Sequence, residues 1–174
     1  MTRIPVPDPA DMSDAERAVY ERFPANLTRA LVRATPEIAD GYLDLGTAFP
    51  RSPLDPKLRE MVILRVGALS RSAYERMQHI GIAHAVGVTD AEVAALESGR
   101  YDELTIDEAA VLRFVDELVA TPKATATFDA ALQALGEQGL AIVTLLVGHY
   151  MMTARFLETF DVDLDAAPTS WEHL

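Results

Sequence analysis

The stretch Leu58–Gly87, LREMVILRVGALSRSAYERMQHIGIAHAVG, decides the fold. Its first part is apolar almost all round over Met61–Leu69, which is typical of a helix that is buried on every side. Its second part begins with a helix-start signal at Ser72 and stops at Gly87, because glycine commonly ends a helix. With a turn near residues 70–72, the two parts predict a buried antiparallel helical hairpin.

Helix-start signals recur on both sides of this hairpin. Capping boxes of the Ser/Thr-x-x-Glu type open at Ser13, Ser72, Thr89 and Thr105. Thr35–Pro36 and Asp55–Pro56 each place a capping residue before a proline at the first helical position, and Asn26 can cap a further helix. The predicted helices span residues 13–23, 26–34, 35–49, 56–69, 72–87, 89–99, 105–120, 127–135 and 137–160.

No run of residues shows the sustained two-residue alternation, rich in β-branched side chains, that indicates a strand. We therefore predict an all-α protein with a single domain over residues 1–174. An extended, proline-rich arm (residues 1–12) precedes the helices, and a mostly irregular tail (residues 161–174) follows them.

Composition narrows the classes of function. A net charge of −12 disfavours binding to nucleic acid or to an anionic membrane surface, since both need clustered Lys and Arg. The longest apolar run, Leu140–Val147, is too short to span a bilayer, and no N-terminal signal is evident, so we expect a cytoplasmic protein. The absence of cysteine excludes disulfides, thiolate metal sites and thiol catalysis.

Three polar residues stand out in the apolar hairpin: Glu60, Glu75 and His79. Glu75 and His79 are four residues apart and share one helix face. Glu60 lies about eleven residues before the turn and His79 about eight after it, so at about 1.5 Å per residue they lie within about one helical turn of each other. We expect the three side chains to converge, an arrangement that suits proton transfer between groups with separated pKa values.

Each of these residues also has a structural interpretation. Glu75 is the third helical residue after Ser72, so it can be the return half of a capping box. Glu60 can be an acid of the first helical turn, where the helix dipole favours negative charge. His79 can be a core histidine. Gly67, on roughly the same face as Glu60, either permits close helix packing or leaves room for a ligand.

The same segment carries a family resemblance. Residues 58–64 (LREMVIL), 74–79 (YERMQH) and 85–92 (AVGVTDAE) resemble the carboxymuconolactone decarboxylase family, which includes the alkylhydroperoxidase D proteins. The segment 145–160, with Gly-His-Tyr at 148–150, is similar to the C-terminal long helix of the longer members. The resemblance implies an alkylhydroperoxidase D-like helical bundle around the hairpin, assembled as a homo-oligomer, a trimer or hexamer.

The peroxidase branch of that family carries two cysteines three residues apart, a histidine four residues after the second, and a relay glutamate nineteen residues before that histidine. Here the histidine matches His79 and the relay glutamate matches Glu60, whereas the cysteine positions hold Ser72 and Glu75. The resemblance therefore implies a cysteine-less, decarboxylase-like member and not a dithiol peroxidase.

We expect a cofactor-free acid/base enzyme, a lyase, isomerase or hydrolase that acts on a small carboxylated or carbonyl-containing molecule. His79 is the expected general acid/base, oriented by Glu60, with Glu75 as the second proton-transfer group. Arg65 or Arg71 is expected to hold a substrate carboxylate. Arg65 should be buried and paired, either with a carboxylate of the site or across a subunit interface.

Other residues have two interpretations each. Tyr74 should pack with its hydroxyl at a partner, and His149 is either a core residue or part of the same pocket. Trp171 can cover a pocket or an interface, or lie exposed. His84 is five residues after His79 and faces elsewhere, so no metal site is expected. The alternative function is a non-catalytic ligand-binding or scaffolding protein of the same fold, and the substrate is not readable from the sequence.

Overall fold

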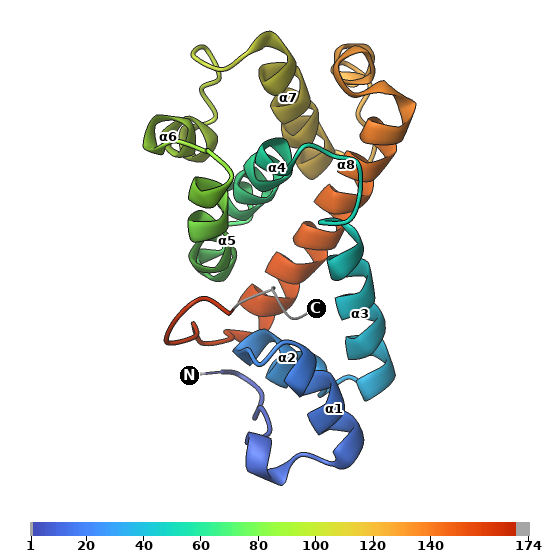
Figure 1. Ribbon diagram of the computed structural model, residues 1–174, viewed down its shortest axis with the longest axis vertical. Coiled ribbons are helices and arrows are strands. Elements are labelled where there is room, and N and C mark those ends of the chain that lie inside the picture. Colours follow the sequence, from blue (N-terminus) through green and yellow to red (C-terminus); the bar gives the residue numbers. More distant parts are fainter. Residues whose placement is uncertain (1, 170–174) are drawn as a thin grey trace.

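The computed structural model describes residues 2–169, and its regular elements are helical throughout that range (Figure 1). The all-α prediction is therefore confirmed. The elements are a short 3-10 helix η1 (Pro9–Asp11) and the α-helices α1 (Asp14–Arg22), α2 (Asn26–Leu31), α3 (Pro36–Ala48), α4 (Pro56–Leu69), α5 (Ala73–Ala85), α6 (Asp90–Ser98), α7 (Ile106–Ala120) and α8 (Phe128–Phe160).

Most helix starts follow the local signals. Ser13, Thr89 and Thr105 each form the predicted reciprocal capping box, with glutamate as the third helical residue. Thr35 and Asp55 each accept a hydrogen bond from a backbone N–H of the first turn, with proline next in sequence. These starts need only a few neighbouring residues, so the sequence predicts them well.

Two predicted caps are wrong. Asn26 is the first residue of α2 and not its cap, and its side-chain amide donates to the carbonyls of Asp163 and Leu164 in the C-terminal tail. Ser72 precedes α5 but makes no capping hydrogen bond. The chain turns tightly there, with Arg71 in the left-handed region (φ 56°), and the Ser72 N–H bonds to the carbonyl of Gly67 at 2.9 Å.

α4 is the central helix, as its apolar sequence predicts. Nine of its residues are buried, and it packs against α5, α6, α7 and α8. Figure 1 shows α4 to α7 and the start of α8 in the upper half, with α1 to α3 around the end of α8 in the lower half. One cluster of the core lies among α4, α7 and α8, a second among α4 to α7, and a third joins α1 to α3 with Tyr74 and Leu157.

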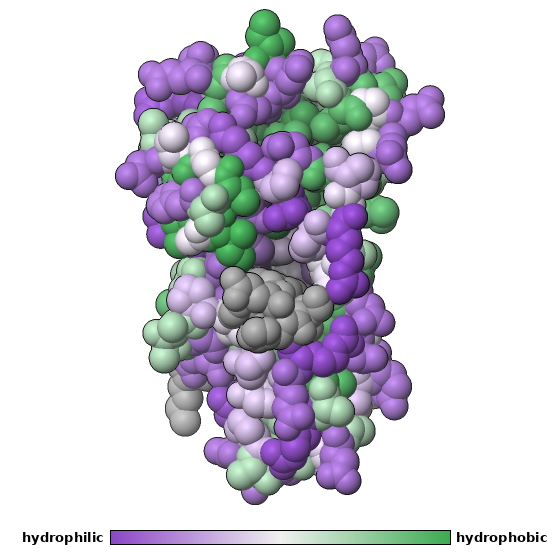
Figure 2. Space-filling view, in the orientation of Figure 1, coloured by the Kyte–Doolittle hydropathy of each residue, from purple (hydrophilic) through white to green (hydrophobic). Residues whose placement is uncertain are grey.

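α8 links the two halves. Gly136 (φ 66°, ψ 175°) interrupts it, so it consists of the two helical segments that the sequence predicts. By length and composition alone α8 could cross a membrane, but half of its most apolar window is buried inside the protein, as in many core helices. Hydrophilic residues cover much of the face in Figure 2, and hydrophobic residues show mainly in its upper half.

Candidate active site

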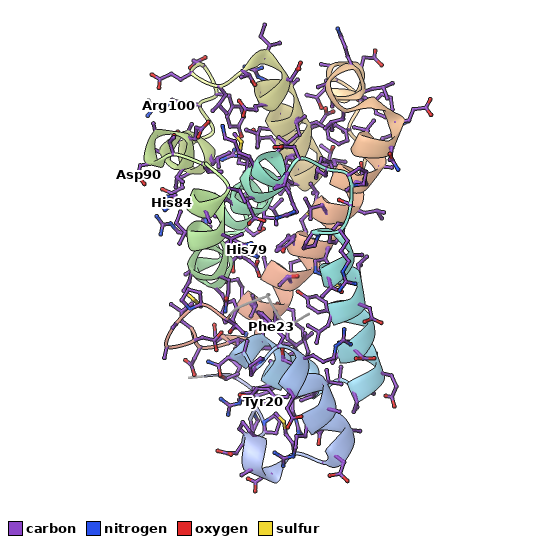
Figure 3. All side chains as sticks on the ribbon, viewed as in Figure 1. Tyr20, Phe23, His79, His84, Asp90 and Arg100 are labelled. Atoms are coloured by element: carbon purple, nitrogen blue, oxygen red, sulfur yellow. The ribbon has the colours of Figure 1, made fainter. Side chains whose placement is uncertain are left out.

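His79 lies on the inner side of α5, toward the middle of the molecule (Figure 3). It is 4% exposed, and its Nδ1 lies 2.9 Å from Oε2 of Glu60 on α4. Its Nε2 lies 3.7 Å from Oε2 of Glu75, one turn earlier on α5. The structure thus brings the three predicted residues together, with the imidazole between two buried carboxyl groups.

Glu60 is held as a carboxylate. Arg59 donates from Nε to Glu60 Oε1 at 3.0 Å, so both oxygens of Glu60 have a partner. Burial raises the pKa of Glu60, but the hydrogen bond and charge of His79, together with Arg59, outweigh it and leave the pKa below its ordinary value. Burial likewise lowers the pKa of His79, and Glu60 and Glu75 reverse this to a net increase. Glu60 therefore keeps the proton of His79 on Nδ1 and directs Nε2 toward Glu75.

Glu75 is in the opposite environment. It is 3% exposed, and in the described part of the chain no hydrogen bond to its carboxyl group is found. Burial raises its pKa to about 7, and the nearby charge of His79 opposes this only in part. Of the two interpretations of Glu75, the capping role is not the one that the structure shows, because neither its side chain nor that of Ser72 caps α5. Gly67 permits the close approach of α4, since a Cβ built there would lie 3.3 Å from Glu75 Cβ.

Two cavities flank the imidazole. The larger, of about 130 Å³, lies on the Glu60 side, and Arg59, Phe49 and Tyr150 also line it. The smaller, which we call the niche, has a volume of about 10 Å³, the space of about one water molecule. The niche lies on the Glu75 side, so it is the one next to Nε2. Its lining residues include Tyr42, Tyr74, Glu75, Gln78, His79, His149 and Tyr150.

His149 lines the niche from α8, so of its two sequence interpretations the pocket is the one that the structure supports. Burial, together with the nearby charge of His79, lowers the pKa of its imidazole to about 4, so the ring is neutral at pH 7. Its ring stacks on Tyr42 with centroids 4.6 Å apart. His149 Nδ1 is buried and has no hydrogen-bond partner among the described residues. A buried polar atom without a partner indicates a place for a water or a ligand atom.

The two arginines expected to hold a substrate lie elsewhere. Arg65 is buried and paired as predicted, but its partners are Asp116 (2.6 Å) and the carbonyl of Leu96 (2.7 Å), and it lines neither cavity. Arg71 is exposed at the turn before α5 and lines a separate surface groove. The cation at the site is instead Arg59.

Tyr74 packs with its hydroxyl at partners, as expected. The hydroxyl contacts the Asp165 carboxylate in the C-terminal tail and accepts a hydrogen bond from the N–H of Leu27 at 3.1 Å.

His84 lies 3.3 Å from Asp90 at the outer edge of the molecule, as Figure 3 shows. Trp171 is outside the described residues. Over residues 2–169, no group of three His, Asp or Glu side chains is placed to hold a metal ion.

Three residues that line the two cavities, Arg59, Tyr42 and Tyr150, are not predicted from the sequence. Arg59 has a local signal, because it is a charged residue next to Glu60, just before the mostly apolar run of α4. The other two are ordinary helix residues in the sequence. Only the tertiary arrangement of α3, α5 and α8 brings them to the cavities beside His79.

The sequence profile of the carboxymuconolactone decarboxylase family matches residues 36–117, which contain α3 to α6, most of α7, and so Glu60, Glu75 and His79. Residues 36–117 therefore resemble that family. No match was found among the curated proteins. The predicted resemblance is confirmed, and the chain carries no cysteine.

Solved structures show the same fold. An alkylhydroperoxidase D core protein of Ralstonia eutropha, described as an uncharacterized peroxidase-related protein, has a TM-score of 0.78 and 15% identity, covering 95% of this chain and 93% of its own. The debrominase Bmp8 in complex with 2,3,4-tribromopyrrole has a TM-score of 0.71 and 14% identity, covering 96% and 92%. A protein of unknown function from Agrobacterium tumefaciens has a TM-score of 0.70 and 16% identity, covering 78% and 95%.

Proposed function

We propose that this protein is a cofactor-free acid–base enzyme that acts on a small carbonyl compound, with His79 and Glu75 as its proton-transfer pair. One observation carries the proposal. The same buried imidazole lies between Glu60, whose pKa is lowered, and Glu75, whose pKa is about 7. Carboxyl groups whose environments separate their pKa values in this way are typical of an acid and a base in one site.

These contacts indicate which groups of the site carry protons near pH 7. Glu60 is ionised and accepts the Nδ1 proton, so Nε2 is the nitrogen that exchanges protons with a substrate. Near pH 7 one proton is shared between Nε2 of His79 and the carboxyl of Glu75, 3.7 Å apart. With that proton on Glu75, the niche holds a base, Nε2, beside an acid, Glu75, and neither needs a cofactor.

This pair suits chemistry next to a carbonyl group. Nε2 removes a proton from the carbon beside the carbonyl, and the electrons of that C–H bond form the enolate, whose oxygen Glu75 stabilises by donating its proton. Return of a proton to another carbon completes an isomerisation. The reverse direction protonates the carbanion that is left when a carboxylate departs as carbon dioxide, which is the decarboxylation that names the family.

The niche favours a neutral carbonyl oxygen over a carboxylate. At neutral pH the titratable groups that face the niche are His79 and Glu75, which share one proton, and the neutral imidazole of His149. A carboxylate entering the niche would lie beside the carboxyl of Glu75 and away from the guanidinium of Arg59, which is on the Glu60 side. Small lactones and ketones are therefore the proposed substrate class. The bound tribromopyrrole of the debrominase is likewise a small ring compound.

Thiol-based chemistry is not part of the proposal. Peroxide reduction by a dithiol needs sulfur atoms that attack and resolve, and the positions that match the family's cysteines are Ser72 and Glu75. The sequence therefore leads us to expect no peroxide consumption with a thiol reductant. Assembly as a homo-oligomer in the cytoplasm remains a proposal that rests on the family, and light scattering of the purified protein tests the assembly.

The test is a screen of small lactones and ketones for turnover, followed by His79→Ala, Glu60→Gln and Glu75→Gln on the best substrate. General acid–base residues typically contribute about 100-fold to 10,000-fold, so each variant should lose activity on that scale. The matched control is His84→Ala, because His84 lies on the same helix and is exposed near Asp90. If His79→Ala and Glu75→Gln retain the turnover of the wild type while folded, the proposed pair is wrong.

A further inference from the structure

An apolar groove lies on the surface between α2, α3 and α8. Its volume is about 400 Å³, within the range of small-molecule sites. Its wall exposes three large hydrophobic side chains: Ile38 is 60% exposed, Leu45 41% and Met152 49%. Leu31 and Phe156 complete the apolar lining. Apolar surface concentrated in a concave site indicates a binding function more strongly than scattered exposed residues do.

The groove adjoins the niche. Tyr42 and Leu27 line both, so these two side chains form the wall between them. Tyr42 and Thr153 are the two hydroxyl side chains of the groove. Thr153 donates its only hydroxyl proton to the carbonyl of His149 at 2.8 Å, so the bond of 2.6 Å between Tyr42 and Thr153 has Tyr42 as the donor. The Tyr42 hydroxyl therefore makes a single hydrogen bond, while its ring stacks on His149 and packs against the core cluster of α1 to α3.

The niche is too small for a substrate while Tyr42 holds this position. It has the space of about one water molecule, yet it contains the buried Nδ1 of His149 without a partner and the carboxyl of Glu75 without a hydrogen bond among residues 2–169. These atoms call for a polar group that reaches them from outside. Rotation of Tyr42 away from Thr153 would join the niche to the groove, which is the larger of the two by far.

We propose that the groove binds the apolar body of the substrate and that Tyr42 is the gate through which its carbonyl group reaches His79. The inference rests on the proposed function and gives it a substrate class, lactones or ketones that carry an alkyl or aryl group. The occupant is a small molecule and not a second copy of the chain, because the groove leads to unpartnered polar atoms at its buried end. An interface between two copies of the chain would not explain why these buried polar atoms have no partner.

Binding is measured first with Nile red, a neutral apolar dye that the net charge of the protein does not repel. The dye should bind at one site per chain and be displaced by γ-lactones of increasing alkyl length. Each added methylene should strengthen binding by up to about fourfold, which corresponds to about 0.8 kcal/mol. Affinity that does not change with alkyl length would overturn the proposal.

Variants locate the site. Met152→Glu and Leu45→Glu should each weaken dye binding at least tenfold. Leu145→Glu is the matched control, because Leu145 lies two turns before Met152 on the same face of α8, is 62% exposed and does not line the groove. The control should bind the dye as the wild type does. If Met152→Glu and Leu145→Glu instead both lower the molar mass in light scattering, this face is an interface between copies, and the proposal is wrong.

The gate has a spectroscopic test. The chain has four histidines, so the ring signals of His149 can be assigned in histidine-labelled protein with single variants. A bound γ-lactone should shift the His149 signals and leave those of His84 unchanged. Tyr42→Phe keeps the ring but removes the hydroxyl that bonds to Thr153, so lactone association should be faster in stopped-flow measurements. Unchanged His149 signals, or an unchanged association rate, would contradict the gate.

The two proposals fail in different ways. If His79→Ala abolishes turnover but the dye and lactones do not bind in the groove, the acid–base function stands and the groove proposal falls. If the lactones bind in the groove and none is turned over, the groove stands as a binding site and the proposed catalysis falls.

Discussion

Replacing Glu75 with glutamine should make the protein more stable at alkaline pH. Burial raises the pKa of Glu75 from an ordinary value of 4.5 to about 7. Between these two values the unfolded chain releases the proton while the folded chain retains it, so stability falls as pH rises from 4.5 to 7. Each pH unit of that interval is worth about 1.4 kcal/mol, so the total loss above pH 7 is about 3 kcal/mol. Glutamine has a similar shape and no charge, and it avoids this loss.

The assay is thermal unfolding by circular dichroism between pH 5 and pH 8. In a chain of this size, about 3 kcal/mol corresponds to about 6–12 °C, so Glu75→Gln should exceed the wild type by that interval at pH 8 and by little at pH 5. Glu60→Gln is the matched control with the opposite sign. The pKa of Glu60 is lower in the folded protein than in the unfolded chain. This difference stabilises the protein at pH values above the unfolded pKa, and the stabilisation is lost as the pH falls through the folded pKa.

Glu60→Gln should therefore lower the melting temperature at pH 7, since it also leaves Arg59 buried without its carboxylate. The two variants change carboxyl groups that contact the same imidazole, so a general effect of glutamine at this site would move both in the same direction. A Glu75→Gln protein that melts below the wild type by the same amount at pH 5 and pH 8 would refute the reasoning, because the carboxyl would then not be desolvated.

Further predictions concern the surroundings of the site. The ring signals of His149 in NMR should titrate near pH 4 and not near 6.5, because burial disfavours the charged imidazole; titration near 6.5 would show that the niche is wet. Gly67→Ala should be less stable than Gly81→Ala in urea unfolding by about 1 kcal/mol or more, since a Cβ at Gly67 meets α5 at 3.3 Å and one at Gly81 meets nothing within 4 Å. Equal stabilities would contradict this packing. Asp116→Ala should cost about 3–5 kcal/mol by leaving the Arg65 guanidinium buried without a carboxylate, and a loss below about 1 kcal/mol would show that the pair is hydrated.

The central part of the fold and of the site is predictable because its signals are local. The apolar run of α4 and the capping residues at Asp55, Thr89 and Thr105 act within a few residues of where they stand. The convergence of Glu60 and His79 follows from helical rise and one short turn, and the structure joins them at 2.9 Å.

The failures have a common physical reason. Ser72 has the local pattern of a cap, but the tight turn at Arg71 directs the Ser72 N–H to the carbonyl of Gly67. The carboxyl of Glu75 therefore does not accept that N–H, and it lies beside His79 instead. The sequence makes Arg65 a candidate to bind a substrate carboxylate, because a buried cation needs an anionic or hydrogen-bonding partner. Which partner it finds depends on α7, where Asp116 lies.

By itself the sequence determined the helices, the buried hairpin and the carboxylate that orients the imidazole, since these depend on spacing within some twenty residues. The tertiary structure alone decided the wall of the niche. Tyr42 and Thr153 are separated by 111 residues and meet only because α3 packs beside α8. The pKa of Glu75 was decided in the same way, because desolvation depends on every element that surrounds a group, and neighbours in sequence supply only part of that shell.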